Sequence, residues 1–283
     1  MTKTASDPSQ PGAFGRFAST LKAIGKTIIL SRSCRITPKA HDKSRLIILG
    51  NGPSLNRTIS EHLETLRHSD LMAVNFAAKA DIFFELKPRY YVLADPHFFD
   101  NDSDPNVVAL LENLKRIDWP MTLFIPRSAR KCRFQQSLDN LSIEYYNAVG
   151  IEGNSAVCHA LFHSGRAMPR PRNVLIPSIM IAIWLGYKEI YLTGADHNWT
   201  KTLSVDDDNN VVSIQPHFYE EDRRETERVR VSYMQYPLHR IVHSFYLAFR
   251  AYHEIASFAK SVGVKIYNAT PGSFIDAFPR KSL

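Results

Sequence analysis

Short apolar runs alternate along the chain with segments whose apolar residues recur every three or four positions. The runs are typical of buried strands, and they lie at Arg45–Leu49, Leu71–Val74, Tyr90–Ala94, Met121–Ile125, Glu189–Leu192 and Val264–Tyr267. The periodic segments predict helices at Thr58–Arg67, Val107–Ile117, Asn173–Leu185 and Leu238–Ser261. This alternation predicts an α/β domain over residues 44–283, with a mostly parallel, Rossmann-like sheet and helices on both of its faces.

The first 43 residues have a different pattern. Residues 1–13 are rich in Ser, Pro and Gly, which predicts disorder. Between Phe14 and Ser33 the apolar residues recur at helical spacing, at Phe14, Phe17, Leu21, Ile24 and Ile28. Basic residues accompany them and acidic residues are absent, so the segment at 14–33 is a candidate for binding a membrane surface. A helix packed on the body, a frayed tail and a transit peptide are the alternatives.

A polar stretch interrupts the α/β pattern at about residues 198–235. Within it, Leu203–Val205 and Val211–Ile214 flank the Asp/Asn-rich segment Asp206–Asn210, which predicts a hairpin. An insertion that follows a sheet strand often carries a lid or an acceptor-binding element in α/β enzymes. We therefore expect a small lid here, with a plain surface hairpin as the alternative.

Composition is ordinary for a globular protein, with 44% apolar and 22% charged residues in 283. The longest apolar run, Val174–Tyr187, is shorter than the roughly 20 residues that cross a bilayer. The three cysteines show no zinc-ligand spacing, and without a secretory leader we expect reduced thiols in a cytoplasmic protein. The net charge of +7 favours an anionic partner, for which nucleotide phosphates and anionic lipids suffice, and we expect no nucleic-acid partner.

The most informative local feature is the turn Gly50-Asn-Gly-Pro-Ser-Leu55 after the first strand. Ligands of open α/β sheets bind outside the carboxyl ends of the strands, where a helix N-terminus offers N–H groups to a phosphate. Gly50 and Gly52 allow close approach of the backbone, Pro53 and Ser54 suit the start of a helix, and the Asn51 side chain can hydrogen-bond a nucleotide. The turn is neither a Walker A loop nor a GxGxxG motif.

Three blocks of the sequence resemble the Campylobacter-type lipooligosaccharide sialyltransferases. The first is the turn at Gly50–Leu55, which is also similar to motility accessory factors and archaeal pterin diphosphokinases. The second is Leu185–Leu192 followed by Gly194 and Asp196, and the third is His239–Ser244. Asn75 and Asp95-Pro96 resemble donor-binding elements in spacing, and Thr270–Ser273 resembles a loop on the nucleotide side.

The resemblance implies a variant of the GT-A fold and a metal-independent glycosyltransferase that needs no cofactor. Its donor would be a nucleotide sugar, such as a CMP-activated sialic-acid-like sugar, and its acceptor a surface glycan such as lipopolysaccharide. By position, Asn51, Gly52 and Asn75 would contact the nucleotide with Asp95 nearby, and Pro53, Ser54, Gly194, Asp196 and Ser273 complete the expected donor side. A lipid-linked acceptor would place the enzyme peripherally on the inner membrane.

The same resemblance assigns the general base to His243. A neutral imidazole accepts a proton near neutral pH, so a histidine within hydrogen-bond reach of the acceptor hydroxyl suits an inverting transfer. His239 lies one helical turn before His243, and such a pair on a half-buried helix face is often merely structural. His217 is the alternative base.

The chain departs from the family where leaving-group tyrosines are expected after the second block. That stretch reads His197-Asn-Trp199, and the next tyrosine is Tyr219. His197, Tyr219 or Arg223 would then supply the donor to the leaving group, and Trp199 would line the acceptor side. Packing roles are the alternative for His197 and Trp199.

Two other functions compete with glycosyl transfer. A pterin-type diphosphokinase would need ATP and Mg²⁺, for which Asp95 and Asp196 are the candidate ligands. A non-catalytic nucleotide-binding protein would keep the turn but lose the chemistry. Asp206-Asp-Asp208 matches the DxD metal motif superficially, yet its Asn-rich surroundings favour an ordinary turn.

Overall fold

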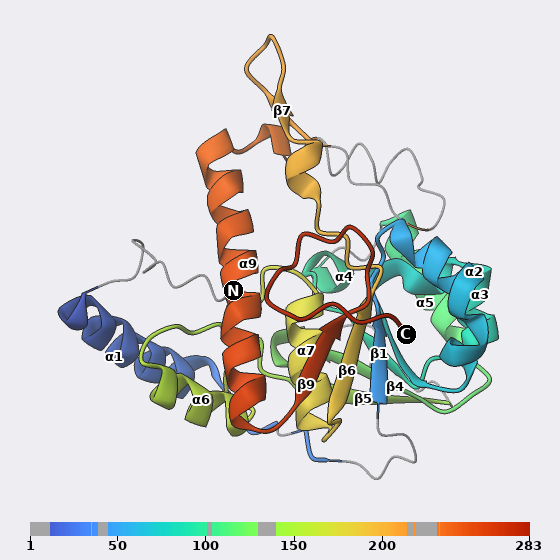
Figure 1. Ribbon diagram of the computed structural model, residues 1–283, viewed down its shortest axis with the longest axis horizontal. Helices are drawn as coiled ribbons and strands as arrows, with labels where there is room; N and C mark the ends of the chain where they lie inside the picture. Colours follow the sequence, from blue (N-terminus) through green and yellow to red (C-terminus); the bar gives the residue numbers. More distant parts are fainter. Residues whose placement is uncertain are drawn as a thin grey trace.

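The computed structural model describes residues 12–34, 36–38, 45–100, 104–129, 140–213, 218, 231 and 233–283. In this part of the chain, one parallel sheet of seven strands runs in the order β5-β4-β3-β2-β1-β6-β9 (Figure 1). The strands are β1 Arg45–Leu49, β2 Asp70–Val74, β3 Tyr90–Val92, β4 Met121–Pro126, β5 Leu141–Tyr146, β6 Glu189–Thr193 and β9 Lys265–Asn268. The predicted α/β fold with a parallel, Rossmann-like sheet is confirmed.

Helices cover both faces of this sheet. The α-helices are α1 Ala13–Leu30, α2 Ser54–Arg67, α3 Asp81–Leu86, α4 His97–Asp100, α5 Pro105–Lys115, α6 Ser155–His163, α7 Leu175–Trp184 and α9 Leu238–Ser261. The 3₁₀ helices are η1 Asn75–Lys79, η2 Arg127–Ala129 and η4 Trp199–Lys201. No helix of the described residues has the length and apolarity needed to cross a membrane.

Alternation of side chains along the strands divides the core between the two faces. In β1, Leu46 and Ile48 join the cluster that contains α7 and α9, whereas Ile47 and Leu49 join the cluster that contains α2. Successive strand residues point to opposite faces, so a strand covered on both sides must be apolar throughout. This explains why the predicted strands read as continuous apolar runs.

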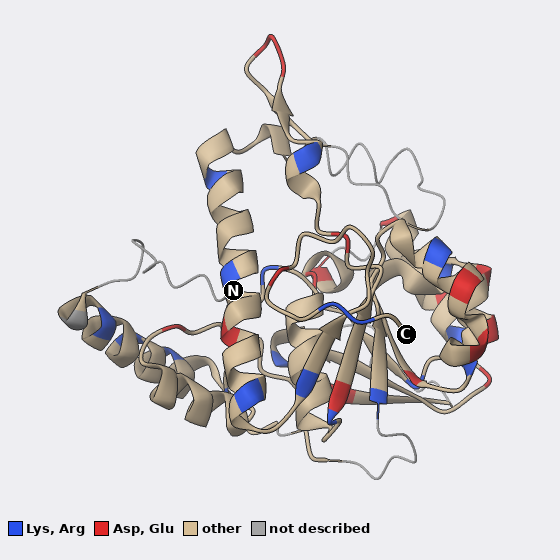
Figure 2. Cartoon of the chain, viewed as in Figure 1, with Lys and Arg blue, Asp and Glu red and all other residues tan. Residues whose placement is uncertain are grey.

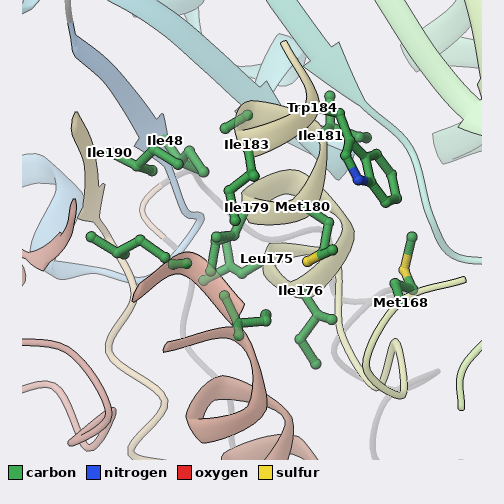
Figure 3. Packing of buried hydrophobic residues seen from close by; sticks show 14 of the residues in the cluster. Ile48, Met168, Leu175, Ile176, Ile179, Met180, Ile181, Ile183, Trp184 and Ile190 are labelled. Atoms are coloured by element: carbon green, nitrogen blue, oxygen red, sulfur yellow. The ribbon is translucent and has the colours of Figure 1, made fainter. Parts of the chain in front are cut away.

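Helix α7 is the centre of the larger core cluster. All ten of its residues are buried, and Figure 3 shows Ile179 and Ile183 on the side of Ile48 of β1 and Ile190 of β6. A helix that is apolar on all sides is stable only where every side is covered. Here the sheet lies on one side and α9 on the other, which explains the near-uniform apolarity of its sequence.

The elements that sequence patterns missed are those without a clear apolar period. In β5 only Tyr146 is fully buried and the other residues are partly or fully exposed, so the strand has no continuous apolar run. Helix α6 is likewise only partly buried, at Cys158 and Phe162. The predicted hairpin is present as β7 Ser204–Val205 and β8 Val211–Val212, but much of the proposed lid lies outside the described residues.

Strand β1, the first along the chain, lies inside the sheet and pairs with β2 on one side and with β6 on the other. The chain proceeds from β1 toward β5 in one direction and from β6 to β9 in the other, so the strand order reverses between β1 and β6. Such a reversal leaves a crevice outside the carboxyl ends of the two strands, where ligands of open α/β sheets bind. The Gly50–Leu55 turn follows β1 at this position.

Two glycine turns meet at the reversal point. The Gly50 amide donates to the Thr193 carbonyl at 2.8 Å, and the Gly52 amide donates to the Gly194 carbonyl at 2.8 Å. A Cβ atom on Gly194 would lie 2.3 Å from the Gly50 carbonyl oxygen, and one on Gly50 would lie 2.5 Å from the Gly194 oxygen. Both residues must therefore be glycine for the backbones to approach this closely.

We expect Gly194→Ala to destabilise the fold by about 1–3 kcal/mol more than Gly263→Ala, because only the former adds overpacking. Both glycines have a positive φ, +60° and +70°, but a Cβ on Gly263 meets nothing within 4 Å. Urea unfolding of the two variants measures the difference. If Gly194→Ala and Gly263→Ala lost the same stability, the segment at Gly194 would have room for a Cβ atom next to Gly50.

Candidate functional site

A cleft of about 550 Å³ lies at the carboxyl ends of β1, β2, β3 and β6. It is bounded by the turn after β1, by the segments that follow β2, β3 and β6, by the loop before α7 and by the first half of α9. The described residues that carry its chemistry are Asn51, Asn75, Asp95, His97, Arg172, Asn173, Asp196, His197, Trp199 and Phe245. Residues from both sides of the sheet reversal thus share one cavity.

Two asparagines on the β1 and β2 side present acceptor atoms without partners. The Asn51 Nδ2 donates to the Val74 carbonyl at 3.1 Å, which fixes the amide and leaves Oδ1 buried with no hydrogen bond. The Asn75 Oδ1 is also buried without a partner, and Asn75 adopts a left-handed backbone with φ of +48°. Leaving a buried polar atom unpaired costs about 1–3 kcal/mol. A ligand that donates hydrogen bonds would remove this cost.

The loop before α7 presents donor atoms to the same cleft. The Asn173 Oδ1 accepts from the Leu175 amide and from the Tyr252 hydroxyl, both at 3.0 Å, while its Nδ2 is buried with no partner. Arg172 is exposed and lines the cleft, and no described carboxylate pairs with its guanidinium. Sequence patterns did not single out either residue. The available signal was their position at the start of a predicted helix at the ligand-binding edge.

The turn after β1 is arranged differently from the sequence-based expectation. The Ser54 hydroxyl donates to the Asp196 carboxylate at 2.7 Å, at the start of α2. The Gly52 amide is already used by the Gly194 carbonyl, and a Cβ on Gly52 would lie 2.0 Å from Asp196 Oδ2. A carboxylate therefore occupies the N-terminal end of α2, and the Gly52 amide is not left over for a phosphate.

His197 is a buried, neutral group in the wall of the cleft. Its Nε2 lies 2.7 Å from the Tyr252 hydroxyl, whose proton is directed to Asn173 Oδ1, so Nε2 carries the imidazole proton and Nδ1 the lone pair. Burial lowers the pKa of His197 to about 3. The residue has a left-handed backbone with φ of +48°. A histidine held neutral in this way acts as a hydrogen-bonding group and is a weak base at neutral pH.

Aromatic rings continue this wall outward from His197. The ring centroids of His197 and Trp199 are 4.2 Å apart, and those of Trp199 and Phe245 are 5.2 Å apart. All three side chains line the cleft, and Trp199 and Phe245 are partly exposed. Rings arranged like this provide a flat apolar surface for the face of a base or of a sugar.

His97 lies at the end of the cleft beside Asp95. The Asp95 Oδ1 accepts from the His97 amide at 2.9 Å and so begins the short helix α4. The His97 Nε2 lies 3.1 Å from a carboxylate oxygen of Asp104, which also caps α5 by accepting from the Asn106 amide. The two atoms do not meet the geometry of a hydrogen bond, but the charge of the carboxylate favours the proton on the nearby Nε2 and leaves Nδ1 as the acceptor. His97 was not identified from sequence.

Helix α9 does not bring its two predicted histidines to the cleft. His239 and His243 are both exposed and lie outside the set of lining residues, and the His243 ring stacks on Tyr246. The reason is the rotation of the helix, which is set by the burial of Ile241 and Tyr252 against the body. The cleft-facing side of α9 is instead formed by Ser244, Phe245 and Ala248.

Ser273 also differs from its predicted donor-binding role. It is buried, its hydroxyl donates to the Ala195 carbonyl at 2.6 Å and accepts from Asn268 Nδ2 at 3.0 Å, and it does not line the cleft. It therefore holds the C-terminal loop against the segment after β6. His217, Tyr219 and Arg223 lie outside the described residues.

Of the other predicted residues, Asn51, Gly52, Pro53, Asn75, Asp95, Gly194, Asp196, His197 and Trp199 line the cleft together. Ser54 reaches it only through its hydrogen bond to Asp196. The Asp206–Asp208 segment forms the hairpin turn, in which the Asp206 side chain accepts from the Asn210 amide at 2.7 Å. The described part of the chain contains no group of three or more potential metal ligands.

Comparison with known proteins gives a likeness in structure and none in sequence. No protein-family model matches the sequence, and no curated protein matches it. Among solved structures, the chain is similar to a MAf glycosyltransferase from Magnetospirillum magneticum AMB-1, with 13% identity and a TM-score of 0.49. The match covers 94% of this chain and 38% of that one, so the chain spans little more than a third of that protein's length.

The lowered pKa of His197 predicts a pH-dependent stability. In the unfolded chain this histidine has a pKa of about 6.5 and is protonated below that pH. In the folded chain its pKa is lowered to about 3, so it is protonated only at a much lower pH. Folding therefore loses stability as the pH falls through 6.5, by about 2 kcal/mol between pH 7.5 and 5. His197→Asn keeps a residue that tolerates a positive φ and removes the titration.

Chemical unfolding at pH 7.5 and at pH 5 measures the free energy of unfolding under each condition. The decrease from pH 7.5 to pH 5 should be smaller by about 2 kcal/mol in His197→Asn than in the wild type. His68→Asn is the control, because His68 is exposed. An unchanged pH dependence in His197→Asn would contradict the buried, neutral state of His197.

Proposed function

We propose that this chain is a glycosyltransferase whose cleft binds a nucleotide-sugar donor. The observation that carries the proposal is that the cleft contains both hydrogen-bond acceptors and hydrogen-bond donors without partners. Asn51 and Asn75 offer acceptor oxygens in the segments after β1 and β2, and Asn173 and Arg172 offer donors in the loop before α7. A nucleotide complements both, because its ribose and base donate hydrogen bonds while its phosphate accepts them.

This arrangement of acceptors and donors also gives the nucleotide a direction in the cleft. The phosphate belongs beside Arg172 and Asn173 Nδ2, and not at the start of α2, where Asp196 already supplies a negative charge next to Ser54. Arginine is suited to phosphate because its planar guanidinium forms paired, charge-assisted hydrogen bonds. The ribose hydroxyls then face Asn51 and Asn75.

Support for a sugar as the transferred group comes from the outer part of the cleft. Trp199 and Phe245 present ring faces on which a pyranose can stack, and Asp95 and Asp196 can accept hydrogen bonds from its hydroxyls. The resemblance of the Gly50–Leu55 and Leu185–Asp196 blocks to the sialyltransferases favours a CMP-activated, sialic-acid-like donor. A surface glycan such as lipopolysaccharide is the corresponding acceptor.

The chemistry follows a single displacement. The acceptor hydroxyl attacks the anomeric carbon, the bond from that carbon to the phosphate oxygen breaks, and the configuration inverts. The proton of the hydroxyl moves to His97, whose other ring nitrogen faces Asp104. Arg172 stabilises the charge on the departing phosphate. His97 suits the base role better than His197, whose pKa is lowered to about 3, or the exposed His243.

A diphosphokinase would use the same cleft differently. Asp95 and Asp196 both line it, and paired carboxylates are the usual ligands for the magnesium that accompanies ATP. Tight ATP binding that depends on Mg²⁺, together with the inertness of all nucleotide sugars, would favour that alternative. Binding of a nucleotide sugar without turnover would favour a non-catalytic protein.

Binding of nucleotide sugars should depend on Arg172. We expect Arg172→Ala to weaken binding by roughly 10–100-fold, because the variant loses one charge-assisted hydrogen bond to the phosphate. Such a bond contributes about 1.5–3 kcal/mol. Titration calorimetry with CMP-, UDP-, GDP- and TDP-sugars measures it. Arg166→Ala is the matched control, because Arg166 is exposed and outside the cleft. Equal affinity in the two variants would remove Arg172 from the phosphate site.

Turnover should depend on His97 and not on His243. We expect His97→Ala to reduce transfer or donor hydrolysis by about 10²–10⁴-fold with little change in donor affinity, the usual range for a lost general base. His243→Ala should retain near wild-type turnover, because its ring is exposed on the far side of α9 from the cleft. The opposite result would restore His243 as the base, and full inertness toward every nucleotide sugar would remove the glycosyltransferase proposal.

A further inference from the structure

Helix α1 exposes to solvent the side on which its large apolar residues lie. The large apolar residues of the helix are all exposed, from Ile24 at 37% to Phe14 at 85%, and the others are Phe17, Leu21, Ile28, Ile29 and Leu30. An amphipathic helix packed on a globular body normally buries this stripe. Here the stripe has no partner among the described residues.

The opposite side of α1 attaches the helix to the body. Ala23 and Thr27 are buried, the Lys26 ammonium donates to the Gly150 carbonyl at 2.6 Å, and the Thr20 hydroxyl accepts from the Asn154 amide at 2.8 Å. A Cβ atom on Gly153 would lie 2.8 Å from the Thr20 hydroxyl oxygen, so the two segments are in close contact.

Just beyond the helix, Asn147 continues the attachment. Its side chain accepts from the Arg32 amide at 3.0 Å and donates to the Arg32 carbonyl at 3.1 Å. The rotation of α1 is therefore fixed by small and polar residues and by backbone groups. Consequently the apolar stripe faces outward as a permanent feature of the fold, alongside α6 at one edge of the molecule (Figure 1).

Charge distinguishes the possible occupants of this stripe. Helix α1 contains Arg16, Lys22 and Lys26 but no acidic residue, and Arg32 follows it (Figure 2). Lys26 is used in attachment, and the Arg32 guanidinium donates to the Ile29 and Ser31 carbonyls while keeping its charge at the end of the helix. Arg16 and Lys22 lie near the exposed apolar side chains. A second copy of the chain would bring two basic helices together, which is unfavourable. An anionic lipid surface complements both the apolar and the basic groups.

We propose that α1 is a docking helix for an anionic bilayer surface, with its apolar stripe in the membrane interface. Phe14, Phe17 and Ile28 enter the boundary between headgroups and acyl chains, and the basic side chains extend to the headgroups. Because α1 is fixed to the body, the membrane also sets the orientation of the whole domain. The inference is independent of the chemistry of the cleft.

Co-sedimentation of the full chain with lipid vesicles tests the proposal. We expect binding to vesicles of mixed phosphatidylcholine and phosphatidylglycerol, weaker binding to phosphatidylcholine alone, and weakening by added salt. The double variant Phe17→Ser, Ile28→Ser should bind roughly 10²–10⁴-fold less tightly, because it removes two large apolar side chains from the membrane interface. The control is Val108→Ser, an exposed apolar residue on α5.

The exposure of Phe17 and Ile28 means that the double variant should unfold at the wild-type temperature, which separates docking from folding. Failure of the wild type to bind either vesicle, or equal binding by the double variant, would overturn the proposal. Sedimentation equilibrium provides the remaining test. A dimer of the wild type that the double variant loses would assign the stripe to a second copy of the chain instead.

Discussion

The close contact between Gly50 and Gly194 determines the geometry of the cleft. These residues end the two strands between which the order of the sheet reverses, and each would clash with the other's carbonyl oxygen if it carried a Cβ atom. Their contact holds the turn at Asn51 against the segment that begins at Asp196. Together with the pairing of β1 and β6, this contact fixes the distance between the two halves of the cleft.

Around this contact the structure keeps several groups in states that are unfavourable without a ligand. Asn75 and His197 have left-handed backbones, and Asn51, Asn75 and Asn173 each bury an amide atom without a partner. Each such feature costs of the order of 1–3 kcal/mol, and strain and unpaired groups tend to gather at functional sites. Their concentration in one cleft indicates that stability has been exchanged there for a prearranged binding surface.

Sequence patterns predicted the strands and the glycine turn because those depend on local composition. Continuous apolar runs identify strands that are covered on both faces. The glycines of the Gly50–Leu55 turn are visible in the sequence even though the Gly194 segment that they contact is far away along the chain. Arg172 and His97 were missed because their approach to the cleft depends on strand order, which brings segments far apart in sequence to one edge. Resemblance to the sialyltransferases pointed to the edge of the sheet at which the cleft lies, but it assigned the base to a histidine outside the cleft. The donor sugar stays a prediction.

Each helix that helical periodicity predicted is present, but the period did not give its orientation. At α9 the spacing of His239 and His243 fitted one helix face, but the burial of Ile241 and Tyr252 turned that face to solvent. At α1 the apolar period was correct, yet small and polar residues make the contact with the body. A period specifies which residues share a face, whereas tertiary packing decides what that face meets.

The most direct test of the central claim is a crystal structure of the chain with the nucleotide sugar that binds most tightly. The account predicts the nucleotide at the reversal between β1 and β6, with ribose hydroxyls bonded to Asn51 and Asn75 and the phosphate beside Arg172. A nucleotide bound elsewhere, or one whose phosphate lies at the start of α2 beside Ser54, would contradict it.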